Sequence, residues 1–133
     1  MTDEQKPRRV AVLVEDEFED SEVTGPVELL QAAGLEVVLV GPLLGHIYTG
    51  KKGTTVVAEL AAGKARARDF DAVVVPGGHA PDRMRMRHAM VDLVRDMIAA
   101  GKPVVVDGPV ITSRKPDDIP FFSDAIIAAL SRE

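Results

Sequence analysis

The chain has 133 residues, of which 46% are hydrophobic and 28% charged, with a formal net charge of −5. This length supports one compact domain with its own core, and the acidic balance disfavours general nucleic-acid binding, which needs basic patches. Because the sequence has no cysteine, it has no disulfide, thiolate nucleophile or Cys-ligated metal. The apolar runs are too short for a membrane-spanning helix, and the N-terminus lacks the apolar stretch of a signal peptide. We expect a soluble, cytoplasmic protein that binds neither nucleic acid nor membranes.

The first strands are predicted from two short apolar runs. Residues 1–9 are expected to form a flexible leader, followed by a single domain over residues 10–133. The run Val-Ala-Val-Leu-Val at residues 10–14 is typical of a strand that is buried on both faces, as in a parallel sheet. Residues 35–40 predict a second strand of the same kind.

The segments around the second strand are more varied. Thr24 and Pro26 predict the N-cap and first turn of a helix, which Gly34 ends. Residues 41–57 hold four glycines and short alternating pieces, which predict a hairpin or an irregular excursion. Residues 58–69 are rich in alanine and permit a weakly amphipathic helix.

The second half of the chain returns to alternating strands and helices. Residues 70–75 and 104–106 are valine-rich and predict two further strands. Residues 82–100 carry an apolar stripe at helical spacing. Residues 110–113 predict a hairpin partner, and a last helix is expected from Pro116 onward. This alternation predicts an α/β fold with a doubly wound, mostly parallel sheet flanked by helices.

Chemistry is expected beyond the carboxyl ends of the strands, where open parallel sheets bind ligands. Residues 15–22 place six carboxylates directly after the first strand, and Pro-Gly-Gly follows the third at residues 76–78. The carboxylates allow three interpretations: a solvated loop near a helix N-terminus, a general acid or base in the cleft, or a site for a hard cation. Glycines without Cβ atoms let backbone amides approach a ligand closely.

Other polar residues give weaker signals. His79 follows the glycine pair and is better placed for a ligand than His46 or His88. Four methionines at helical spacings are expected to pack in the core: Met84, Met86, Met90 and Met97. Four arginines on the same predicted helix could pair with acids or phosphates, but a solvated face is favoured: Arg83, Arg85, Arg87 and Arg95.

Four segments together resemble the DJ-1/PfpI family and follow its order along nearly the whole chain. They are Phe-Glu-Asp-Ser-Glu at residues 18–22 with Pro26 after it, the turn at 50–53, the run from Phe to Asp at 70–82, and residues 105–118. The resemblance implies a flavodoxin-like fold of the glutamine amidotransferase-like superfamily, shortened relative to the family. It also implies that residues 105–118 form a C-terminal hairpin that leads into the last helix.

The resemblance also exposes a missing segment. Family members run from Gly-Lys-Pro-Val into a strained turn that carries a nucleophilic cysteine, whereas here residues 101–104 pass almost directly into Val-Val-Asp-Gly. Roughly forty to fifty residues of the family pattern are therefore absent, the nucleophile elbow among them. Family activities such as aldehyde hydration, deglycation and amide or peptide hydrolysis depend on that thiolate.

Some family site residues do have counterparts here. Glu22 matches the pocket carboxylate that bonds the cysteine, and Gly78 matches an oxyanion-hole amide. Glu19 matches a nearby acidic position, Gly77 supports the turn, and His79 follows it. Without a thiol, Glu22 is expected to be partly buried with no obvious partner, which is costly.

The junction at residues 104–107 can be aligned in two ways. If residues 104–106 formed the elbow strand, Asp107 would lie near the cleft. The alignment to the C-terminal hairpin matches more consecutive residues and is preferred.

Three functional hypotheses follow. The first is a thiol-less binding or assembly module, self-associating as a dimer or larger oligomer and taking a small aldehyde or amide-type ligand, with no cofactor or metal. The second is a residual hydrolase, deglycase or glyoxalase that uses Glu22, Asp107 or His79 as acid or base. The third is a phosphorylation-receiver domain, suggested by Glu-Asp-Glu at residues 15–17 but opposed by Pro76 at the phosphoacceptor position.

Overall fold

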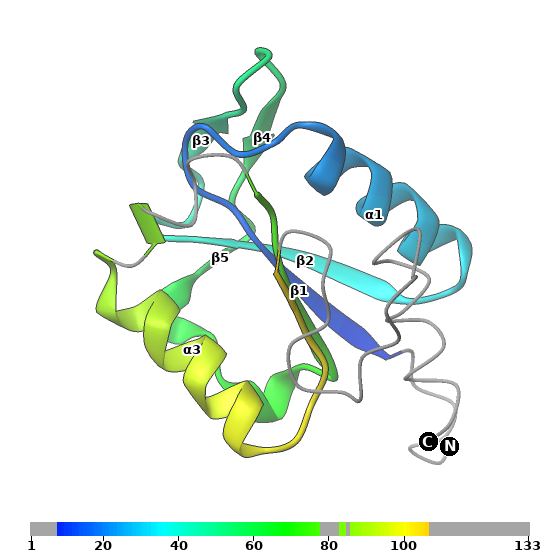
Figure 1. Ribbon diagram of the computed structural model, residues 1–133, viewed down its shortest axis with the longest axis vertical. Helices are drawn as coiled ribbons and strands as arrows, with labels where there is room; N and C mark the ends of the chain where they lie inside the picture. The colour runs from blue at the N-terminus through cyan, green and yellow to red at the C-terminus, as the bar shows by residue number, and fades with distance from the viewer. Residues whose placement is uncertain (1–7, 78–82, 85, 107–133) are drawn as a thin grey trace.

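A five-stranded parallel sheet forms the centre of the protein (Figure 1). We analysed a computed structural model that describes residues 8–77, 83–84 and 86–106. The strand order is β5-β2-β1-β6-β7. The strands are β1 (Arg9–Leu13), β2 (Glu36–Gly41), β5 (Leu60–Ala61), β6 (Ala72–Val75) and β7 (Val104–Val106). All four pairings are parallel, which confirms the predicted mostly parallel α/β sheet.

Helices cover both faces of this sheet, which makes it doubly wound. Helix α1 (Ser21–Ala32) lies on one face and α3 (His88–Ala99) on the other (Figure 1). Residues 10–13 and the whole of β6 are at most 6% exposed. Strands buried on both faces have no solvent side, so continuous valine-rich runs replace the usual alternation of polar and apolar residues.

The glycine-rich excursion contains the predicted hairpin. Strands β3 (Ile47–Thr49) and β4 (Thr55–Val57) pair antiparallel as a separate two-stranded sheet. Gly53 in the connecting turn has φ = +96°, a conformation that a side chain with a Cβ rarely adopts. The hairpin projects beside the carboxyl end of β1 (Figure 1).

Helix α1 begins earlier than predicted. It starts at Ser21, so Pro26 lies inside the helix and not in its first turn. The prediction relied on the preference of proline for a helix start. A proline further along lacks the N–H that would bond the carbonyl four residues before it, but the burial of Val23, Pro26 and Leu30 against the core supports the longer helix.

Two other predicted helices were partly wrong. Residues 58–69 form β5 and two short 3₁₀ helices, Ala62–Lys64 and Ala67–Asp69. Ala62 and Ala65 are buried three residues apart, a spacing that suits 3₁₀ geometry. Helix α3 starts only at His88, because Arg87 has an extended backbone with φ = −111°.

The strand at the junction, β7, lies at the edge of the described sheet. Residues 104–106 pair in parallel with β6, the arrangement that a right-handed β-α-β crossover through α3 produces. This confirms the predicted strand over residues 104–106, whereas the hairpin alignment depends on residues after 106 and stays a prediction. The predicted pairing of residues 110–113, the last helix, Asp107 and residues 1–7 of the leader lie outside the described residues. β1 begins at Arg9, so this residue belongs to the sheet.

No helix within the described ranges is long and apolar enough to span a membrane.

Candidate functional site

Glu22, in the first turn of α1, is held by the backbone that follows β6. The Gly77 N–H donates to Glu22 Oε1 over 2.6 Å. The Gly77 carbonyl in turn accepts a bond from the backbone N–H of Glu19 over 3.0 Å. The expectation that Glu22 would have no partner was therefore wrong. This short hydrogen bond ties the start of α1 to the carboxyl end of β6.

The other predicted site residues are only partly placed. Glu19 is half-buried, and its Oε2 lies 3.9 Å from Lys51 Nζ, at the limit of an ion pair. Gly78 and His79 lie outside the described residues. The structure thus brings together Glu22, Glu19 and Gly77, three of the five residues that the family resemblance singled out.

Two carboxylates of the acidic loop are buried, so the solvated-loop interpretation was wrong for them. Glu15 is 2% exposed and Asp20 is 7% exposed. Asp20 Oδ1 accepts the backbone N–H of Lys52 and Oδ2 that of Thr54, both over 2.9 Å. Asp20 therefore fastens the turn of the β3–β4 hairpin to the start of α1.

The same contacts explain the acidity of Asp20. The hydroxyl of Thr54 and the backbone amides of Lys52 and Thr54 lower the pKa of Asp20 to about 2, against the opposing effect of burial. These bonds favour the charged form. The close approach of Asp20 to the turn requires glycine at position 50, because a Cβ atom there would lie 2.7 Å from the Asp20 carboxylate oxygens.

Glu17 occupies an unusual backbone conformation between these two acids. Its φ is +68°, which costs energy in a residue other than glycine. Its backbone N–H bonds the Thr49 carbonyl over 2.8 Å, and its Oε2 lies 2.8 Å from Arg83 Nη2. This pairing raises the pKa of Arg83. The side chain of Arg83 is 49% exposed, as the predicted solvated face requires, and it also pairs with an acid.

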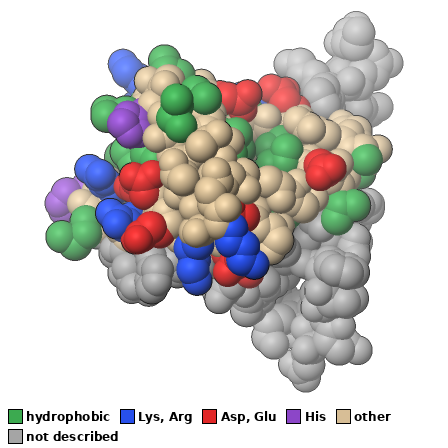
Figure 2. Space-filling view, turned by 90° about the horizontal axis from the view of Figure 1, so that it is seen from above, with side chains coloured by type: hydrophobic (Ala, Val, Ile, Leu, Met, Phe, Trp, Pro, Cys, Tyr) green, Lys and Arg blue, Asp and Glu red, His purple; other side chains and the backbone are tan. Residues whose placement is uncertain are grey.

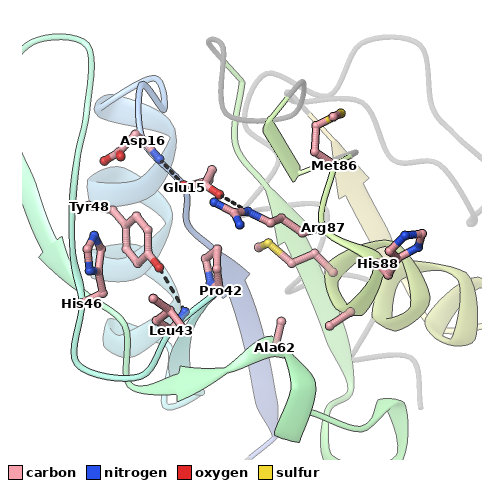
Figure 3. Close-up of a pocket in the computed structure, with 12 residues that line it drawn as sticks. Glu15, Asp16, Pro42, Leu43, His46, Tyr48, Ala62, Met86, Arg87 and His88 are labelled. Carbon is pink, nitrogen blue, oxygen red and sulfur yellow. Dashed lines mark hydrogen bonds and ion pairs between the residues drawn. The ribbon is translucent and has the colours of Figure 1, made fainter.

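A cavity of about 470 Å³ opens between the hairpin and the start of α3. Figure 3 shows Glu15 and Arg87 at its centre, with Tyr48 and His46 on one side and the start of α3 on the other. Arg87 Nε lies 3.1 Å from Glu15 Oε2, so Arg87 also pairs with an acid. This lining does not include Glu22 or Gly77.

Three of the four methionines behave as predicted. Met84, Met90 and Met97 are buried, whereas Met86 is 80% exposed. Met86 precedes α3, so it does not belong to the buried face of that helix. His46 and His88 line the cavity. Within residues 8–77, 83–84 and 86–106, no group of three metal-ligating side chains lies close enough to hold a cation.

Comparison with known proteins agrees with this fold. The model of the DJ-1/PfpI family matches residues 8–105. The chain belongs to the DJ-1/PfpI family. An uncharacterized protein of Archaeoglobus fulgidus is 32% identical, over 93% of this chain and 99% of that relative. Protein/nucleic acid deglycase 2 of Escherichia coli is 39% identical, over 77% of this chain and 61% of that relative.

The solved structures are similar over part of their length. A two-domain protein from Anabaena variabilis, with dj-1/thij/pfpi-like and ferritin-like domains, is 40% identical with a TM-score of 0.73, covering 74% of this chain and 29% of that chain. The chain therefore spans less than two thirds of that protein and of the Escherichia coli relative. The Archaeoglobus alignment extends over 167 residues, more than this chain contains, so that relative holds residues inside the matched region that have no counterpart here.

Sequence reasoning missed the Glu15–Arg87 pair and the role of Asp20. The residues of the pair are 72 positions apart, and neither lies in a segment that carries the family resemblance. For Asp20, the glycine-rich turn at residues 50–53 was a usable signal, since tight turns expose amides that need an acceptor.

Proposed function

We propose that this member of the DJ-1/PfpI family is a binding or assembly module without thiol-dependent catalysis. The observation that carries the proposal is the 2.6 Å bond from Gly77 N–H to Glu22 Oε1 in a chain that has no cysteine. In the family pattern the matching carboxylate bonds a thiol. Here a backbone amide satisfies the carboxylate, so it remains stable in a half-buried position without sulfur.

The chemical reason is that the covalent step needs a thiolate on a strained turn. A carboxylate alone supplies acid or base catalysis, which contributes roughly 10²–10⁴-fold, and it forms no covalent adduct that splits the reaction into easier steps. We therefore expect the site around Glu22 and Gly77 to bind small aldehyde or amide-type ligands without turning them over.

Exposed apolar side chains support the assembly part of the proposal. Ile47 and Val57 face each other across the β3–β4 hairpin and are 57% and 49% exposed. Leu43 and Leu44, just before the hairpin, are more than 60% exposed. Figure 2 shows hydrophobic side chains gathered beside histidine and charged side chains on one side of the molecule. Covering such a patch with a second copy would remove apolar surface from water.

Methylglyoxal turnover tests the catalytic half of the proposal. We would compare the native chain with Glu22→Gln and with Glu28→Gln, a matched control in the exposed part of the same helix. The proposal expects no turnover above background in any of them. Turnover in the native chain and in Glu28→Gln, lost in Glu22→Gln, would overturn it.

Light scattering over a range of concentrations tests the assembly half. We expect a dimer or larger species that dissociates when Ile47→Ser and Val57→Ser are combined, with circular dichroism unchanged. A native chain that stays monomeric at high concentration would contradict self-association.

A residual enzyme is the second candidate, because the Escherichia coli relative at 39% identity is named a deglycase. In that candidate Glu22 acts as acid or base, with His79 or Asp107 as further groups. The loss of turnover in Glu22→Gln described above is the result that would favour it. The receiver-like alternative is dropped, because the chain belongs to a different family.

A further inference from the structure

The cavity beside the hairpin combines a small number of charges with apolar walls. Its charged side chains are Glu15, Asp16 and Arg87. The apolar side chains of the lining come from separate parts of the chain: Pro42, Leu43, Ala62, Met86, Ala89 and Met90. At about 470 Å³ the cavity lies within the size range of small-molecule sites, roughly 300–1,000 Å³.

Arg87 is held in one orientation on the cavity wall. Its Nε donates to Glu15 Oε2 over 3.1 Å, and Glu15 Oε1 accepts the backbone N–H of Asp16 over 3.0 Å. The Glu15 side chain is 3% exposed and that of Arg87 is 54% exposed. Within the described part of the chain, the two terminal nitrogens of Arg87 donate no hydrogen bond to a protein atom. The buried acid therefore positions a guanidinium whose outer end is available to a ligand (Figure 3).

The free end of Arg87 suits a carboxylate. A guanidinium presents parallel N–H groups that match the two oxygens of a carboxylate. A dianion such as phosphate fits less well, because the carboxylates of Glu15 and Asp16 share the lining with this single guanidinium and repel added negative charge.

The two carboxylates suit a positive group on the same ligand. Each carboxylate oxygen can accept more than one hydrogen bond, and Glu15 accepts one bond at each of its oxygens. Asp16 Oδ1 accepts the backbone N–H of Thr49 over 3.0 Å. An ammonium group beside these oxygens would balance the charge that Arg87 leaves uncompensated.

We propose that this cavity binds a small zwitterion of the free α-amino acid type. Its carboxylate bonds the terminal nitrogens of Arg87, its ammonium group lies against Glu15 and Asp16, and an apolar side chain packs on Leu43 and Met90. This site is separate from the Glu22–Gly77 contact, so the proposal does not depend on the proposed function.

The chain provides its own reporter for this site. Tyr48 is the only tyrosine in the sequence, which also lacks tryptophan, and it lines the cavity with its hydroxyl bonded to the Leu43 N–H over 3.0 Å. Intrinsic fluorescence therefore reports on the cavity wall. We would titrate the native chain with leucine, with N-acetyl-leucine, which lacks the ammonium charge, with leucinamide, which lacks the carboxylate, and with inorganic phosphate.

Leucine should give a saturable fluorescence change, with matching heat in calorimetry. Each derivative should bind at least roughly tenfold more weakly, because a charge-assisted bond is lost. Phosphate should give no saturable change. Equal binding of leucine and both derivatives, phosphate binding as tight as leucine, or no saturable signal with any probe would overturn the proposal.

Variants distinguish a loss of ligand binding at this cavity from a loss of folding. Arg87→Met should weaken leucine binding at least roughly tenfold, whereas Arg95→Met, on the exposed face of α3 where it pairs with Asp92, should leave it unchanged. Because Arg87→Met leaves Glu15 unpaired, a second variant combines Arg87→Gln with Glu15→Gln, which removes both charges and keeps a hydrogen-bonded pair. Leucine binding by this folded double variant at native affinity would overturn the assignment.

Discussion

The loop between β1 and α1 buries two carboxylates, Glu15 and Asp20, and stabilises them by different means. Glu15 pairs with the guanidinium of Arg87, whose side chain is 54% exposed. Asp20 accepts backbone amides from the hairpin turn, at Lys52 and Thr54. An arginine side chain can rotate into solvent, but the amides of a closed turn cannot leave without opening the turn.

The two acids therefore make two different connections between elements, one through backbone amides and one through a side chain. Asp20 connects α1 to the β3–β4 hairpin through donors that belong to the backbone. Glu15 connects the same loop to the start of α3 through the guanidinium of one side chain, on the wall of a cavity. We expect removal of the Asp20 contacts to change the fold locally. Removal of the Glu15–Arg87 pair should change mainly the charge and shape of the cavity.

Asp20→Ala should have the largest effect on stability. The amides of Lys52 and Thr54 and the hydroxyl of Thr54 would lose their acceptor together, so we expect the melting temperature to fall by roughly 10 °C. Circular dichroism during heating measures it. Asp96→Ala, an exposed acid on α3, is the matched control and should change the melting temperature little; equal losses in both variants would contradict the role of Asp20.

Arg87→Met should have the next largest effect. It leaves the Glu15 carboxylate without its cation, which we expect to cost about 1–2 kcal/mol, below the range for fully buried pairs because Arg87 is half exposed. Urea unfolding measures this cost. Adding Glu15→Gln should restore part of the stability, because the buried group is then neutral; a double variant no more stable than Arg87→Met would show that the pair does not act through charge.

The pH dependence of stability should distinguish Asp20 from the other acids. Its pKa in the folded protein is about 2, below the ordinary value of 3.8, so its contribution is present above the ordinary pKa and is lost as the pH falls toward 2. The melting temperature of the native chain should therefore fall further than that of Asp20→Asn between about pH 5 and about pH 2. Parallel curves for the two proteins would exclude this linkage.

Lys51→Ala should have the smallest effect. Its Nζ lies 3.9 Å from Glu19 Oε2, and both side chains are partly exposed, so the change in unfolding free energy should be below about 0.5 kcal/mol. The backbone N–H of Lys51 bonds the Phe18 carbonyl over 2.9 Å and is retained in alanine. A larger loss of unfolding free energy in urea would mean that the Lys51–Glu19 pair stabilises the hairpin more than the backbone amides bonded to Asp20 do.

The parts of the fold that were predictable depend on local patterns. The valine-rich runs of β1, β6 and β7 predicted buried parallel strands, because burial on both faces requires apolar residues at every position. The hairpin was predictable from its glycines. The start of α1 was not, because packing of Val23 and Pro26 outweighed the preference of proline for a first turn.

The candidate site was predictable only where the family resemblance reached. The resemblance singled out Glu22 and Gly77, but the sequence does not show that the Gly77 amide satisfies the carboxylate. That bond joins residues 55 positions apart, and no local rule relates them. The long-range contacts of Arg83 and Arg87 were missed for the same reason, since an arginine beside a helix start is usually solvated.

The sequence by itself determined that the chain is an acidic α/β protein, that it contains no thiol, and that acidic and glycine residues follow its parallel strands. Only the tertiary structure decided which of those acids are buried and what compensates each of them. The physical reason is that strand formation depends on neighbouring residues, whereas the stability of a buried carboxylate depends on donors that folding brings from distant parts of the chain.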